Sequence, residues 1–294
     1  YHGWHDWYMA TNLTDETGLD GHLLPGLQPS GVPRGLMGTT LPFNYNDIDQ
    51  LEGLIKSNNN EIAAIKMEVS RNEGPKNDFL QKVRDLATEN HIILIFDECT
   101  SGFRETFVGL HKKFGVEPDL AVFAKALGNG YAISACIGRE KFMQAAQKTF
   151  ISSTFWTERI GSAAALKTLE VMERTKSWEK ITHTGLQIRQ HWSKLAKEYS
   201  LDLNISGLPA VQSYAFCSNN NLKYKTLITQ EMLKKGFLST PLVFSSTAHS
   251  EDDINLYVSA LRECFSLVKE CENGLDVDSI LEGPVCHSGF RRLN

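Results

Sequence analysis

HIILIFDECTSGFR (His91–Arg104) is the stretch of sequence that decides the fold, together with PDLAVFAKALGNGYAISACIG (Pro118–Gly138) after it. In each stretch a short apolar run ends at a charged side chain, Asp97 in the first and Lys125 in the second. Apolar runs of this length, bounded by turn residues, are typical of strands buried in a sheet. Helical patterns alternate with these runs, which predicts an α/β fold with a largely parallel sheet.

Working outward, EIAAIKMEV predicts a further buried strand that ends near Glu68, and NDFLQKVRDLATEN predicts an amphipathic helix after it. Ligands of open α/β sheets bind beyond the carboxyl ends of the strands. Glu68, Asp97 and Lys125 all lie at such ends. We therefore expect their side chains to gather at one edge of the sheet.

The second part of the chain has a different pattern, in which short strands and helices alternate around a smaller core. This predicts a large α/β domain over residues 1–176 and a smaller α+β domain over residues 177–294. We expect helices at 161–174, 178–199, 225–235 and 252–270, and strands at 212–217 and 238–243.

The composition excludes several classes of protein. A net charge of -5, with no basic stretch interleaved with aromatics, argues against binding to nucleic acid or to an anionic membrane. No apolar run reaches the length of a membrane span, and the opening YHGWHDWYMATN does not resemble a signal peptide. The six cysteines and nine histidines lack metal-site spacing, so we expect no metal and reduced thiols in the cytoplasm.

An acid and a lysine at neighbouring strand ends suit pyridoxal phosphate. Its aldehyde condenses with a lysine amine as a Schiff base, and a carboxylate keeps its ring nitrogen protonated. We expect Lys125 to be drawn toward the core, since burial lowers the pKa of an amine and makes it nucleophilic. The alternatives are a lysine extended toward solvent at a strand end and an aspartate, Asp97, that caps a turn.

Two further positions carry candidate binding groups. Tyr1, before His2 and Gly3, has an aromatic ring that can stack on a flat cofactor, although terminal residues are often frayed. Thr154, in ISSTFWTERIG, precedes a predicted helix and could donate to a phosphate. The simpler interpretation of this Ser/Thr cluster is a helix N-cap.

Four motifs together resemble the class III aminotransferases, which depend on pyridoxal phosphate. They are YHG (1–3), FDECTSGFR (96–104), PDL with AKALGNG (118–130) and STF (153–155). The resemblance covers residues 1 to about 270, and the GFR ending of the acid motif is most similar to the glutamate-1-semialdehyde aminomutase branch. It implies fold type I and transfer of an amino group from a small-molecule donor to a carbonyl acceptor.

The resemblance also implies a role for each matching residue. Lys125 forms the Schiff base and moves the substrate proton, and Asp97 pairs with the ring nitrogen. Tyr1, beside His2, stacks on one face of the ring and Cys99 lies against the other. Thr154 reaches the cofactor phosphate of a partner subunit, because the active sites of the family lie at a homodimer interface, and Glu68 is an acid near the site.

Two departures from the family pattern keep alternatives open. Family members have a long segment before the YHG motif, including a loop that binds the phosphate, so we expect the large-domain sheet to be incomplete at its N-terminal side. The chain is then a piece of a longer protein, a chain completed by another, or a catalytically silent homologue. TPLVFSSTAH (240–249) lacks an expected glutamate, which leaves aminotransferase and aminomutase as competing functions.

Overall fold

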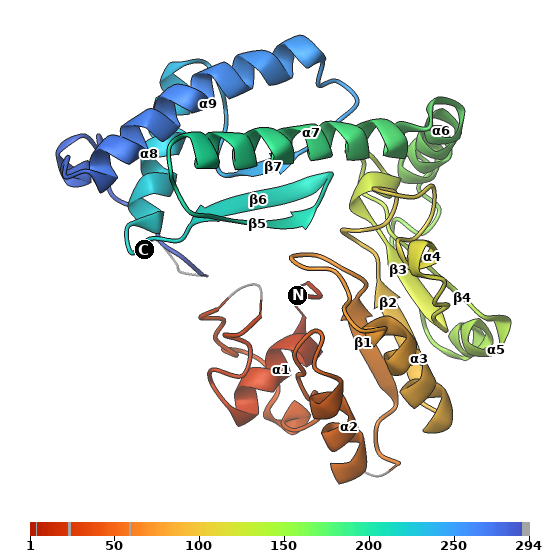
Figure 1. Ribbon diagram of the computed structural model, residues 1–294. Coiled ribbons are helices and arrows are strands. Elements are labelled where there is room, and N and C mark those ends of the chain that lie inside the picture. The colour runs from red at the N-terminus through yellow and green to blue at the C-terminus, as the bar shows by residue number, and fades with distance from the viewer. Residues whose placement is uncertain (4, 23–24, 59, 290–294) are drawn as a thin grey trace. The chain divides into compact units, whose positions relative to one another are not determined.

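The computed structural model describes residues 1–3, 5–22, 25–58 and 60–289, drawn as ribbons in Figure 1. The chain divides into two compact units. The first comprises residues 1–65, 75–93 and those described after residue 286, and the second comprises residues 66–74 and 94–286. Neither unit coincides with the domain division expected at residue 176, which stays a prediction.

The first unit begins with helix α1 (Asp6–Thr14), which the sequence patterns did not predict. The helix buries Tyr8 and Met9 in a small core with Leu19 and Leu27. Asn12 holds the following loop against this helix, because its side-chain amide donates to the Leu27 carbonyl (2.6 Å) and its side-chain oxygen accepts from the Leu19 backbone N–H (3.0 Å). A short 3₁₀ turn, η1 (Arg34–Leu36), completes this part of the unit.

Two amphipathic helices follow, and the second of them is the helix that the sequence predicts after the Glu68 strand. Helix α2 (Ile48–Ser57) starts at Asp47, whose carboxylate accepts from the Gln50 backbone N–H and satisfies one of the open donors of the first turn. Helix α3 (Phe79–Glu89) buries its apolar face, which consists of Phe79, Leu80, Val83 and Ala87. The spacing of these four residues at three and four positions explains why the segment is a helix with one buried side.

The main sheet has the order β1-β2-β3-β4. Its strands are β1 (Ala64–Glu68), β2 (Ile93–Asp97), β3 (Leu120–Phe123) and β4 (Ala135–Gly138). Strands β2 and β3 are parallel, with Asp97 opposite Val122, so their carboxyl ends meet at one edge. Strand β4 runs antiparallel to β3, which makes the sheet mixed.

A second sheet is antiparallel, with the order β5-β6-β7. It comprises β5 (Leu203–Leu208), β6 (Val211–Phe216) and β7 (Leu242–Phe244), and its core includes residues of helices α7 (Ser177–Glu198), α8 (Asn221–Lys234) and α9 (Glu251–Glu272). The sequence did not predict β5, and β7 begins four residues later than expected. Pro241, inside the expected strand, has no N–H to donate to a sheet, which explains the late start.

The second unit contains further helices and turns that connect these elements. They are α4 (His111–Phe114), η2 (Lys125–Leu127), α5 (Glu140–Met143), η3 (Gln144–Lys148), α6 (Ile160–Thr175) and η4 (Val277–Ser279). Helix α6 is followed by Lys176, whose left-handed backbone (φ 48°) turns the chain into α7. Among the described residues, no helix is both long and apolar enough to cross a membrane.

Candidate active site

Asp97 is the last residue of β2 and is buried, with only 6% of its surface exposed. One carboxylate oxygen, Oδ1, accepts a hydrogen bond from the Cys99 backbone N–H (3.1 Å). The other, Oδ2, lies 3.8 Å from the Lys66 Nζ. A carboxylate in such surroundings is costly to bury without partners of opposite charge or hydrogen-bond donors, so these contacts keep Asp97 at the sheet edge.

Glu98, the residue after Asp97, holds the loop that follows, and the sequence analysis did not single it out. Its side chain is fully buried and accepts from the His111 backbone N–H (2.9 Å). His111 Nδ1 lies 2.8 Å from the same carboxylate oxygen, and the Ser101 hydroxyl donates to the other. The loop after Asp97 is therefore fixed to helix α4 by one acidic side chain.

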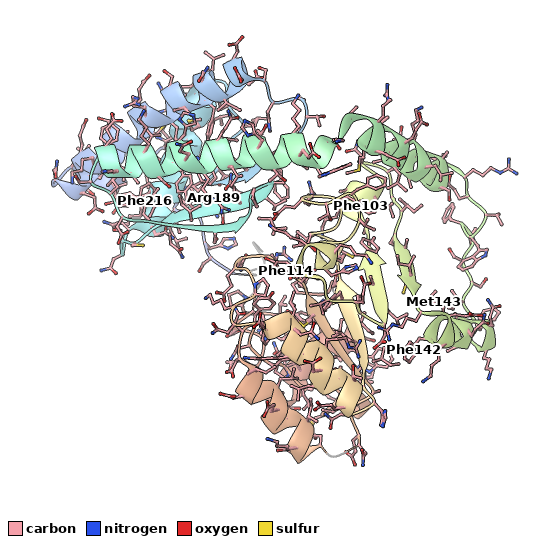
Figure 2. All side chains as sticks on the ribbon, turned by 45° about the vertical axis from the view of Figure 1, so that its right-hand side comes forward. Phe103, Phe114, Phe142, Met143, Arg189 and Phe216 are labelled. Carbon is pink, nitrogen blue, oxygen red and sulfur yellow. The ribbon has the colours of Figure 1, made fainter. Side chains whose placement is uncertain are left out.

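Phe103 lies near the C-terminal end of the same loop and packs against the main sheet. Its backbone has a positive φ of 61°, and its ring packs on Phe123 of β3 with the ring centres 5.4 Å apart. Figure 2 shows Phe103 close to the upper end of the main sheet. Gly102 permits the close approach, because a Cβ there would lie 2.7 Å from the Phe123 ring. The small residue at 102 thus lets the loop fold back on the strand.

Lys125 lies immediately beyond β3, at the first position of η2. Its Nζ donates to the Thr100 hydroxyl (2.9 Å), which joins the ends of β2 and β3. The side chain is exposed, so the expected burial in the core was wrong. The reason is local: Lys125 has a left-handed backbone (φ 45°), as does Asn129 in the GNG turn, and the chain leaves the strand before the lysine.

Strand β1 adds two charged groups. Ile65 and Met67 are buried, whereas Lys66 and Glu68 alternate with them and are only partly buried. Glu68 pairs with Arg71, whose Nη1 lies 3.0 Å from the Glu68 Oε1. Lys66 is a further residue that the sequence analysis missed. The available signal was a single lysine between two apolar residues in a predicted buried strand.

Cys99 lies between these groups. Burial, followed by the nearby Asp97 carboxylate, raises the pKa of the Cys99 thiol to about 11, while Lys125 and Lys66 act in the opposite direction. The thiol is therefore neutral at physiological pH and behaves as a small apolar group. The charges of Lys66, Asp97 and Lys125 thus all influence this one thiol.

The remaining predicted residues are Thr154, Tyr1 and His2. Thr154 is exposed in a turn, and helix α6 begins only at Ile160, so Thr154 is not the N-cap of that helix. Tyr1 and His2 belong to the first unit, where their rings contact Tyr8 edge-on at centre distances of 5.7 and 6.2 Å. The cofactor roles of Tyr1, His2, Cys99, Thr154 and Glu68 stay predictions.

The chemistry of the groups at the edge fits pyridoxal phosphate. A buried carboxylate, Asp97, can hold a protonated ring nitrogen, and the exposed amine of Lys125 is accessible to an aldehyde. Thr100 fixes the position of that amine. Metal chemistry has no comparable donor set here, since the described part of the chain contains no group of three or more histidine, cysteine or acidic side chains placed to hold a metal ion.

Comparisons with known proteins agree with this assignment. The chain is 33% identical over 282 residues to the 3-aminobutyryl-CoA aminotransferase of Cloacimonas acidaminovorans, which covers 92% of the chain and 64% of that relative. It is 27% identical over 292 residues to the glutamate-1-semialdehyde 2,1-aminomutase of Hyperthermus butylicus, covering 92% of the chain and 67% of the relative. The chain thus spans about two thirds of the length of these relatives.

Solved structures show the same fold. The FumI protein of Sphingopyxis, in its pyridoxal phosphate internal aldimine form, superposes with a TM-score of 0.80 at 24% identity, covering 92% of this chain and 70% of that one. An omega-transaminase from Sphaerobacter thermophilus gives 0.79 at 21% identity, covering 90% and 66%. The predicted α/β fold of type I is confirmed, as is pyridoxal phosphate as the cofactor of the family. The sequence model of the class III aminotransferases matches residues 17–244, and the chain belongs to this family.

Proposed function

We propose that the protein transfers amino groups between a small-molecule amino donor and a carbonyl acceptor with pyridoxal phosphate. The observation that carries this proposal is the arrangement at the carboxyl ends of β2 and β3, where the buried Asp97 and the amine of Lys125 follow neighbouring parallel strands. Membership of the class III family supports it. When bound, the cofactor supplies an aldehyde that takes up the amino group and a protonated ring that withdraws electrons.

The side chains of this chain divide the remaining work. Asp97 carries the negative charge that keeps a ring nitrogen protonated, and its burial strengthens that interaction because few water molecules compete. Lys125 Nζ, held by Thr100, is the point of covalent attachment and the base that moves the proton at the substrate carbon. Cys99, neutral at physiological pH, gives a ring face an uncharged contact.

The test of this proposal is covalent trapping of the cofactor. The protein is incubated with pyridoxal phosphate, reduced with borohydride and digested, and we expect the mass of the reduced cofactor on the peptide containing Lys125. Lys125→Ala should abolish this adduct and lower turnover of amino donors by at least about 100-fold, since a positioned base contributes that much or more. Lys223→Ala, which removes a lysine paired with Asp278, is the control. Wild-type turnover by Lys125→Ala would refute the proposal.

An aminomutase is the second candidate function, because the Hyperthermus relative carries that name and the GFR motif favours that branch. An aminomutase moves the amine within one substrate, whereas an aminotransferase releases a keto acid from a separate donor. Detection of a stoichiometric keto acid product supports aminotransferase activity. Isomerisation without consumption of a donor supports the aminomutase.

We further propose that the protein acts as a homodimer. Large apolar side chains cluster over residues 150–166 and are exposed in the single chain, including Phe150 (98%), Phe155 (76%), Trp156 (67%) and Leu166 (70%). Exposed apolar surface of this density favours association with a partner. The family resemblance implies that Thr154, in the same segment, reaches the site of that second copy. The six cysteines are free thiols, which favours the reducing cytoplasm as the location.

A further inference from the structure

The pairing of Lys66 with Asp97 is a feature that the proposed function does not use. Lys66 Nζ lies 3.8 Å from Asp97 Oδ2, on the side of the carboxylate away from the oxygen that accepts from Cys99. The Lys66 side chain is 35% exposed and that of Asp97 is 8% exposed. A cation therefore already lies beside the carboxylate that we assign to the ring nitrogen.

The position of Lys66 in β1 directs its side chain toward this edge. Ile65 and Met67 on either side of it are buried at 4% exposure each, so the alternation of the strand sends Lys66 to the other face. Glu68 lies on that same face and forms an ion pair with Arg71. The amine of Lys66 is thus directed to Asp97.

We propose that Lys66 has a place-holding role at Asp97. By this we mean that Lys66 pairs with the Asp97 carboxylate in the cofactor-free protein and opposes binding of the protonated ring nitrogen of pyridoxal phosphate. This inference rests on the proposed function. Two cations that share one carboxylate repel each other, so the positive charge of Lys66 weakens cofactor binding. In the cofactor-free protein the same charge compensates part of the cost of burying Asp97.

For Lys66→Met we therefore expect a lower melting temperature together with a higher affinity for pyridoxal phosphate. Simple damage to the fold does not produce this combination. The cofactor-free variant should melt lower by roughly 2 °C, because a stabilising ion pair is lost. Its affinity for pyridoxal phosphate should nevertheless rise by about 5- to 10-fold, the scale expected for one charge interaction near a surface. A variant that only damages the fold loses both stability and affinity.

The experiment measures the dissociation constant of pyridoxal phosphate by equilibrium dialysis of the protein. Lys66→Arg retains the positive charge and should bind like the wild type. Lys223→Met removes a lysine with matching exposure, 34%, paired with Asp278, and should change nothing. An analogue with carbon in place of the ring nitrogen should show no gain in affinity in Lys66→Met, because it carries no competing positive charge.

The outcomes separate this inference from the proposed function. Tighter binding by Lys66→Met that disappears with the carbon analogue supports the place-holding role. Unchanged or weaker binding of pyridoxal phosphate by Lys66→Met, while the wild type binds normally, overturns the role of Lys66 alone. No binding by the wild-type protein overturns the proposed function, and the inference falls with it.

Discussion

Two segments assigned to the same cofactor, residues 97–104 and residues 149–160, are built in opposite ways. In the first, Asp97, Glu98 and Ser101 are buried, and Glu98 bonds to His111, thirteen positions away. In the second, Phe150 is almost fully exposed and Phe155 is largely exposed. The hydrogen bonds described for this segment span only two to four positions. The first segment is fixed by its own chain, while the second presents apolar surface outward.

The same difference distinguishes two groups of residues in the proposed site, Asp97 and Lys125 on the one hand and Thr154 on the other. The chain itself determines where Asp97 and Lys125 lie, because buried strands and a hydrogen bond from Lys125 to Thr100 hold them. Thr154 has no such support from the hydrogen bonds described around it, and the residues that follow it, Phe155 and Trp156, are exposed. Three measurements test this contrast, in order of expected effect.

Glu98→Ala should cause the largest change. It leaves the His111 and Ser101 donors without their buried acceptor, and breaking such a network costs about 3–5 kcal/mol of unfolding free energy. The measurement is urea unfolding followed by circular dichroism. Glu117→Ala is the control, because Glu117 faces the same His111 (3.9 Å) but its side chain is 53% exposed, so the cost should stay below about 1 kcal/mol. Equal losses for both variants would contradict the assigned role of Glu98.

Phe155→Ser should act on association rather than on folding. Removing an exposed aromatic anchor from the proposed dimer surface should weaken the dimer by about 10- to 100-fold, measured by analytical ultracentrifugation. The unfolding free energy of the single chain should change by less than about 0.5 kcal/mol. Leu238→Ser is the matched control, since Leu238 is 96% exposed outside the 150–166 segment. A dimer unaffected by Phe155→Ser removes that surface from the interface.

Alkylation of cysteines tests the smallest effect. The pKa of Cys99 is raised from 9.0 to about 11, so its reactive thiolate is about 100-fold scarcer at pH 8 and becomes abundant only as the pH rises toward 11. Labelling with iodoacetamide, read by peptide mass spectrometry, should therefore modify the exposed Cys136 well before Cys99. If Cys99 reacts at pH 8 as fast as Cys136, its surroundings are less apolar than described.

The sequence predicted those parts of the fold whose apolar periodicity is strong. Helix α3 and strand β2 follow from the spacing of Val83 and Leu94 with their neighbours, because burial of one face dictates each pattern. Strand β5 was missed because Asn204, Ser206 and Gly207 interrupt its apolar residues. Its pairing with β6, rather than its own composition, makes it a strand.

For the candidate site, the sequence predicted Asp97 at the end of β2 and Lys125 just beyond the end of β3, but it missed their partners. Asp97 and Lys125 stand out because a charge after an apolar run is unusual. Glu98 depends on His111, and Lys66 depends on Asp97, and such contacts arise only when separate segments fold together. The exposure of Lys125 was missed for a related reason, because the left-handed turn that carries it is a backbone property.

At Lys125 the left-handed backbone conformation lowers the stability of the fold, whereas the proposed reaction requires a lysine at this position. A non-glycine residue in this conformation costs on the order of 1 kcal/mol, and glycine adopts it without steric penalty. Changes selected only for thermal stability therefore favour replacing the one residue whose amine the proposed reaction requires. A lysine retained here is a mark of selection for activity, and its loss in a relative of this chain signals a protein released from that selection.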